Sequence, residues 1–309
     1  MLTQETLTSL KSGQTASGVV LIRDYAIKIA KNGSEYITGT FQSGTTMYFK
    51  AWGNTSAFRS LKEFDYRNVP TLITAQADDF GGTISLNFDV VTKAEGYTLD
   101  MFLPNKYNIE AYWTAFRSNA AVLVSDKGLQ VLNMVLFENQ PLVERFKLEF
   151  AAMSHHDNCK GGLLAHTYKA LLLMKYVCKQ YETATSARGT DYTDLLYIGT
   201  ILHDIGKTIE LQMGVYQPES IVTHAYLGME IISQFKDKII ELYSVDWYYE
   251  LASILLQHHG DFGMPCKTVS AYLVHRVDEF ESSLTLLSQL IGDAGDSTSI
   301  KLDTKYLTL

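Results

Sequence analysis

Cysteine is scarce in this chain of 309 residues, and long apolar runs are missing. The three cysteines, Cys159, Cys178 and Cys266, have neither the CxxC spacing of a metal or redox motif nor that of a disulfide framework. No apolar stretch is long enough to span a bilayer, and the first residues, MLTQETLTSLKSGQ, lack the apolar core of a signal peptide. We therefore expect a cytoplasmic protein in a reducing compartment, with no membrane partner.

An excess of basic residues is also missing, which excludes a strongly basic nucleic-acid binder. The formal net charge is −8, and after residue 110 there are 16 Lys and Arg against 23 Asp and Glu. This balance disfavours tight, non-specific binding to duplexes. It leaves open a local cationic groove, or phosphate binding through metal ions whose charge would offset ligand carboxylates.

Histidine is absent from the first 154 residues, and all eight histidines lie between His155 and His275. Most of them form an ordered set with two aspartates. The set is His166, His203, Asp204, His224, His258, His259 and Asp278. Neutral imidazole and carboxylate are the usual protein ligands of Zn, Fe, Mn and similar cations. A single histidine on a helix is more often structural, but the whole set favours a hydrolytic metal site.

Short strands dominate the first hundred or so residues. Residues 18–30, 35–42 and 45–52 are separated by turn signals at Asn32-Gly33 and Ser43-Gly44. A second hairpin, over residues 69–80 and 83–91, surrounds Gly81-Gly82, and a helical piece is expected near residues 56–63. This pattern predicts a small antiparallel barrel over residues 1–104.

Helical spacing takes over after about residue 110. The expected helices span residues 111–125, 128–137, 142–153, 162–181, 193–204, 222–235, 246–258 and 268–291. We place the boundary in Leu103-Pro104-Asn105-Lys106, so that residues 105–309 form an all-helical domain. The fold class is therefore a multi-domain β + α protein, and the tail after Gly292 carries no signal.

Asp204 has a special place in the ligand set. Adjacent helical residues point about 100° apart, so one ion takes both His203 and Asp204 only at a helix end or with a bridging geometry. A carboxylate can bridge two ions through its two oxygens, whereas an imidazole nitrogen cannot. The two sets that Asp204 would join are His166, His203 and Asp278, and His224, His258 and His259. Two such ions can activate water and stabilise the attacking and leaving oxygens of phosphoester hydrolysis; a one-metal site would leave the second set to bind phosphate.

His166, the stretch LHDIGK at 202–207 and Asp278 resemble the HD phosphohydrolase superfamily. His224 and the pair His258-His259 look like its extended, two-metal subset, which includes the HD-GYP cyclic-dinucleotide phosphodiesterases. A closer resemblance is to the YhaM-type 3′→5′ exoribonucleases, which join an N-terminal OB-fold to an HD domain. The similar stretches, in order, are NGSEYITGTFQSGTTMYFKAW, HHDNCKGGLLAHT, LLYIGTILHDIGK, HAYLGMEII, LLQHHGDFGMP and VHRVDEF. The loop after the His pair is shorter than is usual in the YhaM-type family. No Gly-Tyr-Pro motif follows the pair, which weakens the cyclic-dinucleotide interpretation.

The resemblance implies an OB-fold that binds single-stranded RNA or DNA and an HD domain with two divalent cations. Mn²⁺ is the favoured metal, although the ligands also suit Fe, Co, Ni or Zn. The catalytic residues would be Asp204 and Lys207, with the Lys207 ammonium on the scissile phosphate; a solvated helix-end lysine is the alternative. His156 and Arg276 are further candidates for substrate binding, and either is equally a surface residue or half of an ion pair.

Aromatic rings accompany lysines in the predicted barrel. Phe41, Tyr48, Phe49 and Trp52 lie near Lys50, and OB-folds bind single strands by stacking bases on aromatic rings along a cationic groove. The alternation along residues 47–52 places some of these rings in the core, so the sequence does not say which of them contact bases.

The leading hypothesis is a metal-dependent 3′→5′ exonuclease acting on single-stranded RNA, with single-stranded DNA as a further substrate. The first alternative is an HD phosphodiesterase for a small cyclic dinucleotide or oligonucleotide, in which the barrel serves recognition or assembly. The second is a non-catalytic nucleic-acid-binding protein, which the intact ligand set speaks against. The oligomeric state stays open.

Overall fold

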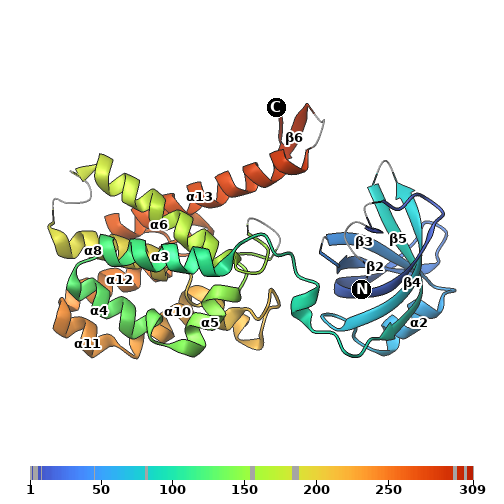
Figure 1. Ribbon diagram of the computed structural model, residues 1–309, viewed down its shortest axis with the longest axis horizontal. Helices are drawn as coiled ribbons and strands as arrows, with labels where there is room; N and C mark the ends of the chain where they lie inside the picture. The colour runs from blue at the N-terminus through green and yellow to red at the C-terminus, as the bar shows by residue number, and fades with distance from the viewer. Residues whose placement is uncertain are drawn as a thin grey trace. The chain divides into compact units, whose positions relative to one another are not determined.

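The structure is a computed structural model, and it describes residues 2, 6–7, 9–44, 46–80, 83–153, 157–182, 188–294, 298–302 and 305–308. The chain divides into two compact units, Met1–Asn105 and Lys106–Leu309 (Figure 1). Within the described ranges, no helix is long and apolar enough to cross a membrane.

The first unit is a closed, five-stranded barrel (Figure 1). Its strands are β1 (Thr15–Ile29), β2 (Glu35–Gln42), β3 (Thr46–Trp52), β4 (Pro70–Phe80) and β5 (Thr83–Lys93). They join in the order β1-β2-β3-β5-β4, and β4 returns to β1. The first half of β1 pairs with β4 and its second half with β2, and the register of the β1–β2 pair shifts between Ile22 and Asp24. The predicted OB-fold is confirmed.

The barrel differs from the prediction at one seam. β3 and β5 are parallel, with Phe49 opposite Leu86, whereas every other strand pair of the barrel is antiparallel. The helix α2 (Ser56–Glu63) lies between β3 and β4, so the chain does not return by a tight hairpin. The Thr55 side chain caps this helix by accepting the Phe58 amide at 3.1 Å. Hairpin signals alone predict antiparallel neighbours, which is why the closing seam was not expected.

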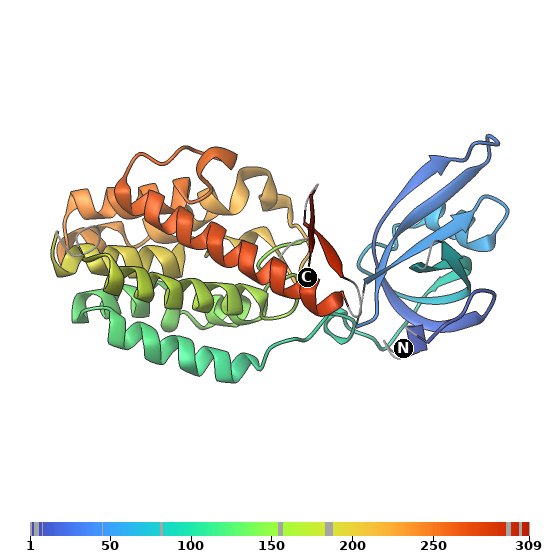
Figure 2. The same ribbon diagram turned by 90° about the horizontal axis from the view of Figure 1, so that it is seen from above.

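The second unit is helical, apart from a hairpin at its end (Figure 2). Its main helices are α3 (Ile109–Leu123), α4 (Asp126–Leu132), α5 (Gln140–Leu148), α6 (Gly162–Gln180), α8 (Thr190–Leu202), α9 (Lys207–Glu210), α10 (Thr223–Ser233), α11 (Lys236–Leu242), α12 (Val245–Gln257) and α13 (Val269–Asp293). A π-helical turn over 133–137 continues α4, and the hairpin consists of β6 (Ser299–Leu302) and β7 (Lys305–Thr308). Every helix predicted from the sequence is found, with shifted ends.

Some elements differ from the prediction. The helix predicted over 142–153 ends at Leu148, because Glu149 is extended and its carboxylate accepts the backbone N–H groups of Phe150, Met213 and Gly214. The short helices α9 and α11 and the hairpin β6–β7 were not predicted. Each of them is so short that its sequence carries little periodicity.

The buried helix α8 is the centre of the second unit. Every residue from Asp194 to Gly206 is buried, so α8 beyond its first turn has no solvent face and packs against neighbours all round. Gly199 lets α12 approach closely, since a Cβ there would lie 2.6 Å from Ile254 Cδ1. This close approach brings the C-terminal ends of α8 and α12, which carry His203 and His258, to the same place.

Candidate metal centre

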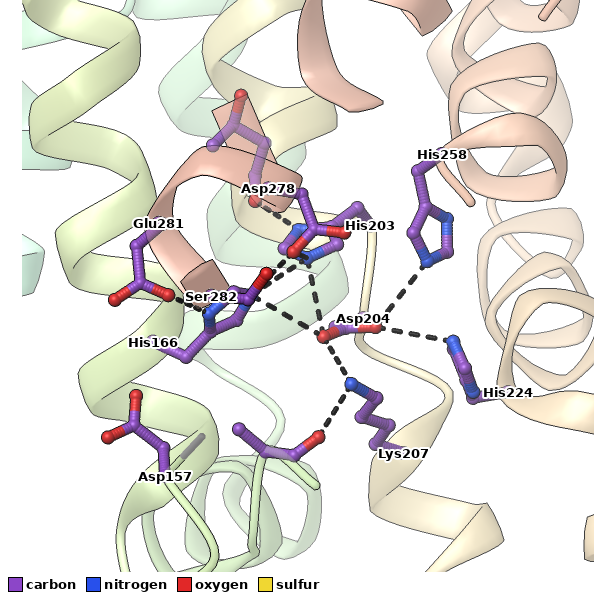
Figure 3. Close-up of polar contacts among 12 residues, drawn as sticks. Asp157, His166, His203, Asp204, Lys207, His224, His258, Asp278, Glu281 and Ser282 are labelled. Atoms are coloured by element: carbon purple, nitrogen blue, oxygen red, sulfur yellow. Dashed lines mark hydrogen bonds and ion pairs between the residues drawn. The ribbon is translucent and has the colours of Figure 1, made fainter. Parts of the chain in front are cut away.

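The predicted ligands converge near the ends of helices (Figure 3). The first turns of α6 and α10, the ends of α8 and α12, and the middle of α13 supply them. They are His166, His203, Asp204, His224, His258, His259 and Asp278. Gly206 fixes the approach of α10, because a Cβ there would lie only 1.9 Å from the His224 carbonyl oxygen. The glycine after the His-Asp pair thus allows the His224 segment to close over it.

One group of donors consists of His166, His203 and Asp278, whose ligand atoms all lie within 4.8 Å of one another. The Nε2 atoms of His166 and His203 are 3.3 Å apart, and His166 Nε2 is 3.2 Å from Asp278 Oδ1. Asp204 Oδ2 faces this group, at 3.3 Å from His203 Nε2. We call these three residues the first triad.

The other group, here the second triad, consists of His224, His258 and His259, again within 4.8 Å of one another. The Nε2 atoms of His224 and His259 are 2.8 Å apart. Asp204 Oδ1 faces this group, at 3.4 Å from His224 Nε2 and 3.6 Å from His258 Nε2. Asp204 therefore lies between the triads with one oxygen toward each.

Hydrogen bonds fix which nitrogen of His203 and of His258 faces the centre. The Nδ1 atoms of His203 and His258 lie 2.7 and 2.8 Å from the carbonyl oxygens of Thr200 and Leu255, three residues earlier. A carbonyl oxygen only accepts, so Nδ1 must carry the proton. The lone pairs of both Nε2 atoms then point into the centre, as ligand imidazoles require.

The donor set fits divalent cations. Asp204 Oδ1 and His258 Nε2 are buried and have no hydrogen-bond partner, and leaving such atoms unpaired costs about 1–3 kcal/mol each. Facing imidazole lone pairs also repel one another unless a cation or a proton lies between them. Three imidazoles beside one carboxylate, and two imidazoles beside two carboxylates, are environments that Mn, Fe, Co, Ni and Zn accept.

The electrostatics of the centre keep its carboxylates ionised. Burial alone would raise the pKa of Asp204, but Lys207 and His203 hold it well below its usual range. The pKa of Asp278 is also lowered despite burial, through its hydrogen bond with His166. Burial lowers the pKa of His259 to about 4, so this imidazole is neutral near pH 7.

His166 is the place where a proton and a cation compete. Burial is the largest influence and opposes protonation, yet hydrogen bonds to Asp278 and Glu281 raise its pKa to about 10. The centre therefore attracts positive charge strongly enough to protonate a fully buried histidine. A cation bound at this position would take the place of that proton.

Lys207 lies inside the centre rather than in solvent. Its Nζ donates to Asp204 Oδ2 at 2.7 Å and to the Ala151 carbonyl at 2.6 Å (Figure 3). Its side chain is only 11% exposed, so the alternative of a solvated helix-end lysine is wrong. The ammonium balances the charge of the carboxylate that lies between the triads.

Another substrate-binding candidate, Arg276, lies outside the group of ligands. The Arg276 side chain is 54% exposed and pairs with Glu279 at 2.6 Å, on a face of α13 that lines a separate groove of about 530 Å³ with α6. Arg276 and Asp278 are two residues apart on one helix and so point to different sides. His156 lies outside the described residues.

Two buried glutamates that contact the ligands were not predicted from the sequence. Glu281 accepts a hydrogen bond from His166 Nδ1, and Glu210 Oε2 lies 2.9 Å from His224 Nδ1. Glu281 follows Asp278 by three residues on one helix, a spacing that places both on one face and that the sequence did offer as a signal. Glu210 offers no such signal, because a loop separates it from His224.

Residues 163–283, which contain the centre, match the family model described as HD domain. Among curated proteins, the chain is similar to the 3′-5′ exoribonuclease YhaM of Listeria innocua, with 31% identity over 160 residues, 48% of this chain and 49% of the relative. The YhaM exoribonuclease of Shouchella clausii is 24% identical over 307 residues, 90% of this chain and 87% of the relative.

A relative with another activity also matches. The dihydroneopterin 2′,3′-cyclic phosphate phosphodiesterase of Methanocaldococcus jannaschii is 28% identical over 137 residues, 43% of this chain and 51% of the relative. The match thus spans about half the length of the first curated relatives. Together, the comparisons show an HD domain in this chain and similarity to the YhaM exoribonucleases.

Proposed function

We propose that this protein is a metal-dependent 3′→5′ exonuclease that hydrolyses single-stranded RNA, with single-stranded DNA as a further substrate. The observation that carries the proposal is the pair of donor triads around Asp204, in a chain that also contains an OB-fold barrel. Similarity over 90% of the chain to a protein named as a 3′-5′ exoribonuclease supports this substrate class.

Each triad, together with one oxygen of Asp204, would hold one divalent cation, and Mn²⁺ is our first choice. Such cations supply an activated water molecule and neutralise charge on the phosphate oxygens. The hydrogen bonds of Nδ1 in His203, His258 and His224 keep these imidazoles in the tautomer whose Nε2 binds metal. No serine or cysteine nucleophile is then required.

Lys207 would act on the phosphate itself. Its ammonium now contacts Asp204 Oδ2, at the point where the two triads meet. In the loaded centre, Lys207 would exchange this carboxylate for a phosphate oxygen of the substrate. There it would stabilise the negative charge that develops as the phosphodiester is cleaved.

The barrel offers an aromatic face for the strand. Phe49 is fully buried, but Tyr48 is 61% exposed and Trp52 is 37% exposed, and both lie on β3. Tyr36 of β2 contacts Trp52 with ring centroids 5.2 Å apart, and Lys50 lies between the two exposed rings along β3. Exposed rings of this kind stack with bases regardless of sequence. We assign base contacts to Tyr36, Tyr48 and Trp52.

The test follows 3′- and 5′-end-labelled RNA and DNA on a sequencing gel with the purified protein and Mn²⁺. We expect a ladder that shortens stepwise from the 3′ end with the wild-type chain. Asp204→Ala should give no ladder and bind less metal, whereas Asp237→Ala, which changes an exposed aspartate in α11, should behave as wild type. Intact strands in Mn²⁺ and in each of the other divalent metals would refute the proposal.

Hydrolysis of a small cyclic phosphodiester is the second candidate function. The similarity to a phosphodiesterase for a 2′,3′-cyclic phosphate favours it. The same protein and metals are incubated with 2′,3′-cyclic nucleotides, and the products are separated by chromatography. Turnover of these compounds together with intact strands would assign the centre to the small substrate.

A further inference from the structure

In each triad, a buried glutamate contacts Nδ1 of one imidazole, on the side of the ring away from the centre. Glu281 in α13 is 2% exposed and accepts the Nδ1–H of His166, which belongs to the first triad (Figure 3). Glu210 at the end of α9 is 8% exposed and lies 2.9 Å from Nδ1 of His224, which belongs to the second triad. Each triad thus contains one imidazole backed by a carboxylate and another backed by a backbone carbonyl.

Glu281 is held in place by its other oxygen. Oε1 accepts hydrogen bonds from Lys169 Nζ at 2.7 Å and from Thr285 Oγ1 at 2.5 Å. Lys169 in turn donates to Asp157 Oδ2 at 2.8 Å, so one ammonium lies between two buried carboxylates. With Oε1 occupied in this way, Oε2 stays on His166.

Glu210 holds both the ring and the backbone of His224. Its Oε1 accepts the His224 backbone N–H at 3.1 Å, while Oε2 takes Nδ1–H. The preceding residue, Thr223, has a φ of 62°, a left-handed value that costs energy for a β-branched residue. The carboxylate therefore stabilises an unfavourable turn that aims His224 at the centre.

We propose that Glu281 and Glu210 are positioning residues, and that each governs the affinity of one cation site. Glu281 would act on the first triad and Glu210 on the second. The inference rests on the proposed metal-dependent function. A carboxylate on Nδ1 fixes the tautomer of a ligand histidine and makes Nε2 more basic, and its removal typically weakens metal binding about 10- to 100-fold. The contacts of the two glutamates within the described residues share no side chain, so their effects should be separable.

The neutral amide of glutamine is a specific probe of this arrangement. In Glu281→Gln, Lys169 requires an acceptor, so the amide oxygen stays with Lys169 and the NH₂ group faces His166 Nδ1. The His166 proton must then move to Nε2, where it occupies the lone pair that a cation needs. In Glu210→Gln, either orientation of the amide sets its NH₂ group against one of the two N–H groups of His224.

The experiment is a calorimetric titration of Mn²⁺ into the cation-free full chain. We expect two classes of site in the wild type, with one weakened about 10- to 100-fold by Glu281→Gln and the other by Glu210→Gln. Glu230→Gln, which changes an exposed glutamate in α10, is the matched control. Circular dichroism melting without metal checks that each variant is folded. If Glu281→Gln does not fold, Glu281→Asp replaces it, because aspartate keeps the charge beside Lys169 but withdraws from His166.

Double variants assign each glutamate to its site. Glu281→Gln should add little to Asp278→Asn, which already damages the first triad, but should add in full to His259→Ala; Glu210→Gln should show the reverse pattern. Equal weakening of both classes by either glutamine variant, or affinities equal to those of the control, would overturn the inference and leave the proposed function standing. Absence of Mn²⁺ binding by the wild type would overturn both.

Discussion

A single methyl group at Gly206 should dismantle the centre although no ligand residue is substituted. Gly206 has ordinary helical dihedral angles, so alanine meets no backbone strain there. The obstacle is space, because the new Cβ would lie 1.9 Å from the His224 carbonyl oxygen and 2.5 Å from the Gly228 nitrogen. Both are backbone atoms, so no side chain can rotate away and the whole N-terminal turn of α10 must move.

The size of the effect follows from these distances. Non-bonded atoms need about 3.5 Å, so α10 must retreat by roughly 1.5 Å, and His224 with it. Overpacking of this kind costs about 1–3 kcal/mol, which lowers the melting temperature by roughly 2–4 °C per kcal/mol for a unit of this size. A ligand displaced by about 1 Å can cost roughly 100-fold in activity. Gly206→Ala should therefore lose far more activity than stability.

Gly228→Ala is the matched control, because Gly228 faces Gly206 across the same contact. A Cβ at Gly228 would meet its nearest neighbours at 3.5 Å, an ordinary contact, and alanine in a helix interior gains about 1 kcal/mol over glycine. Differential scanning calorimetry and the strand assay are run on both variants. Equal melting temperatures and equal rates for the two would refute the idea that this contact sets the position of His224.

Three further predictions concern pH, the barrel and α13. Without a cation, the stabilisation from the raised pKa of His166 is complete below pH 6.5 and is lost as the pH rises to about 10. The melting temperature of the cation-free protein should therefore fall across that window. An unchanged melting temperature would contradict the raised pKa of His166. Tyr48→Ala and Trp52→Ala should each weaken binding of single-stranded RNA by about 1–3 kcal/mol in fluorescence anisotropy, whereas Phe64→Ala, which removes an exposed ring near α2, should not. Arg276→Ala should leave kcat/KM for the strand unchanged, since this side chain lies outside the centre, and a tenfold loss would return it to the substrate path.

The sequence predicted the architecture well where a local signal exists. Turn residues between alternating strands marked the barrel, and helical spacing marked the helices that bring the ligand set together. The parallel seam between β3 and β5 was not accessible, because pairing across a closed barrel depends on how the whole sheet curves. The hairpin β6–β7 was missed because four-residue strands leave too short a pattern.

The ligands of the candidate site were predicted from the sequence, but the glutamates that hold His166 and His224 were not. The spacing within α13 contained the signal for Glu281, three residues after Asp278. The role of Glu210 depends on the loop after α9 and on the left-handed Thr223, which no local pattern announces. For Arg276, the sequence left open whether its side chain binds phosphate or pairs with an acidic neighbour, and in the structure it pairs with Glu279.

The burial of α8 from Asp194 onward has a consequence for how the centre meets its cations. A helical segment with no solvent face opens only when the unit around it unfolds, so its amide hydrogens should be among the slowest to exchange with deuterium. His203 and Asp204 stand at the end of this helix and are buried with it. Their place is set by the apolar core before any ion arrives. The cations should therefore bind to a preformed site with little reordering of the chain. Small domains that fold only around their metal behave differently.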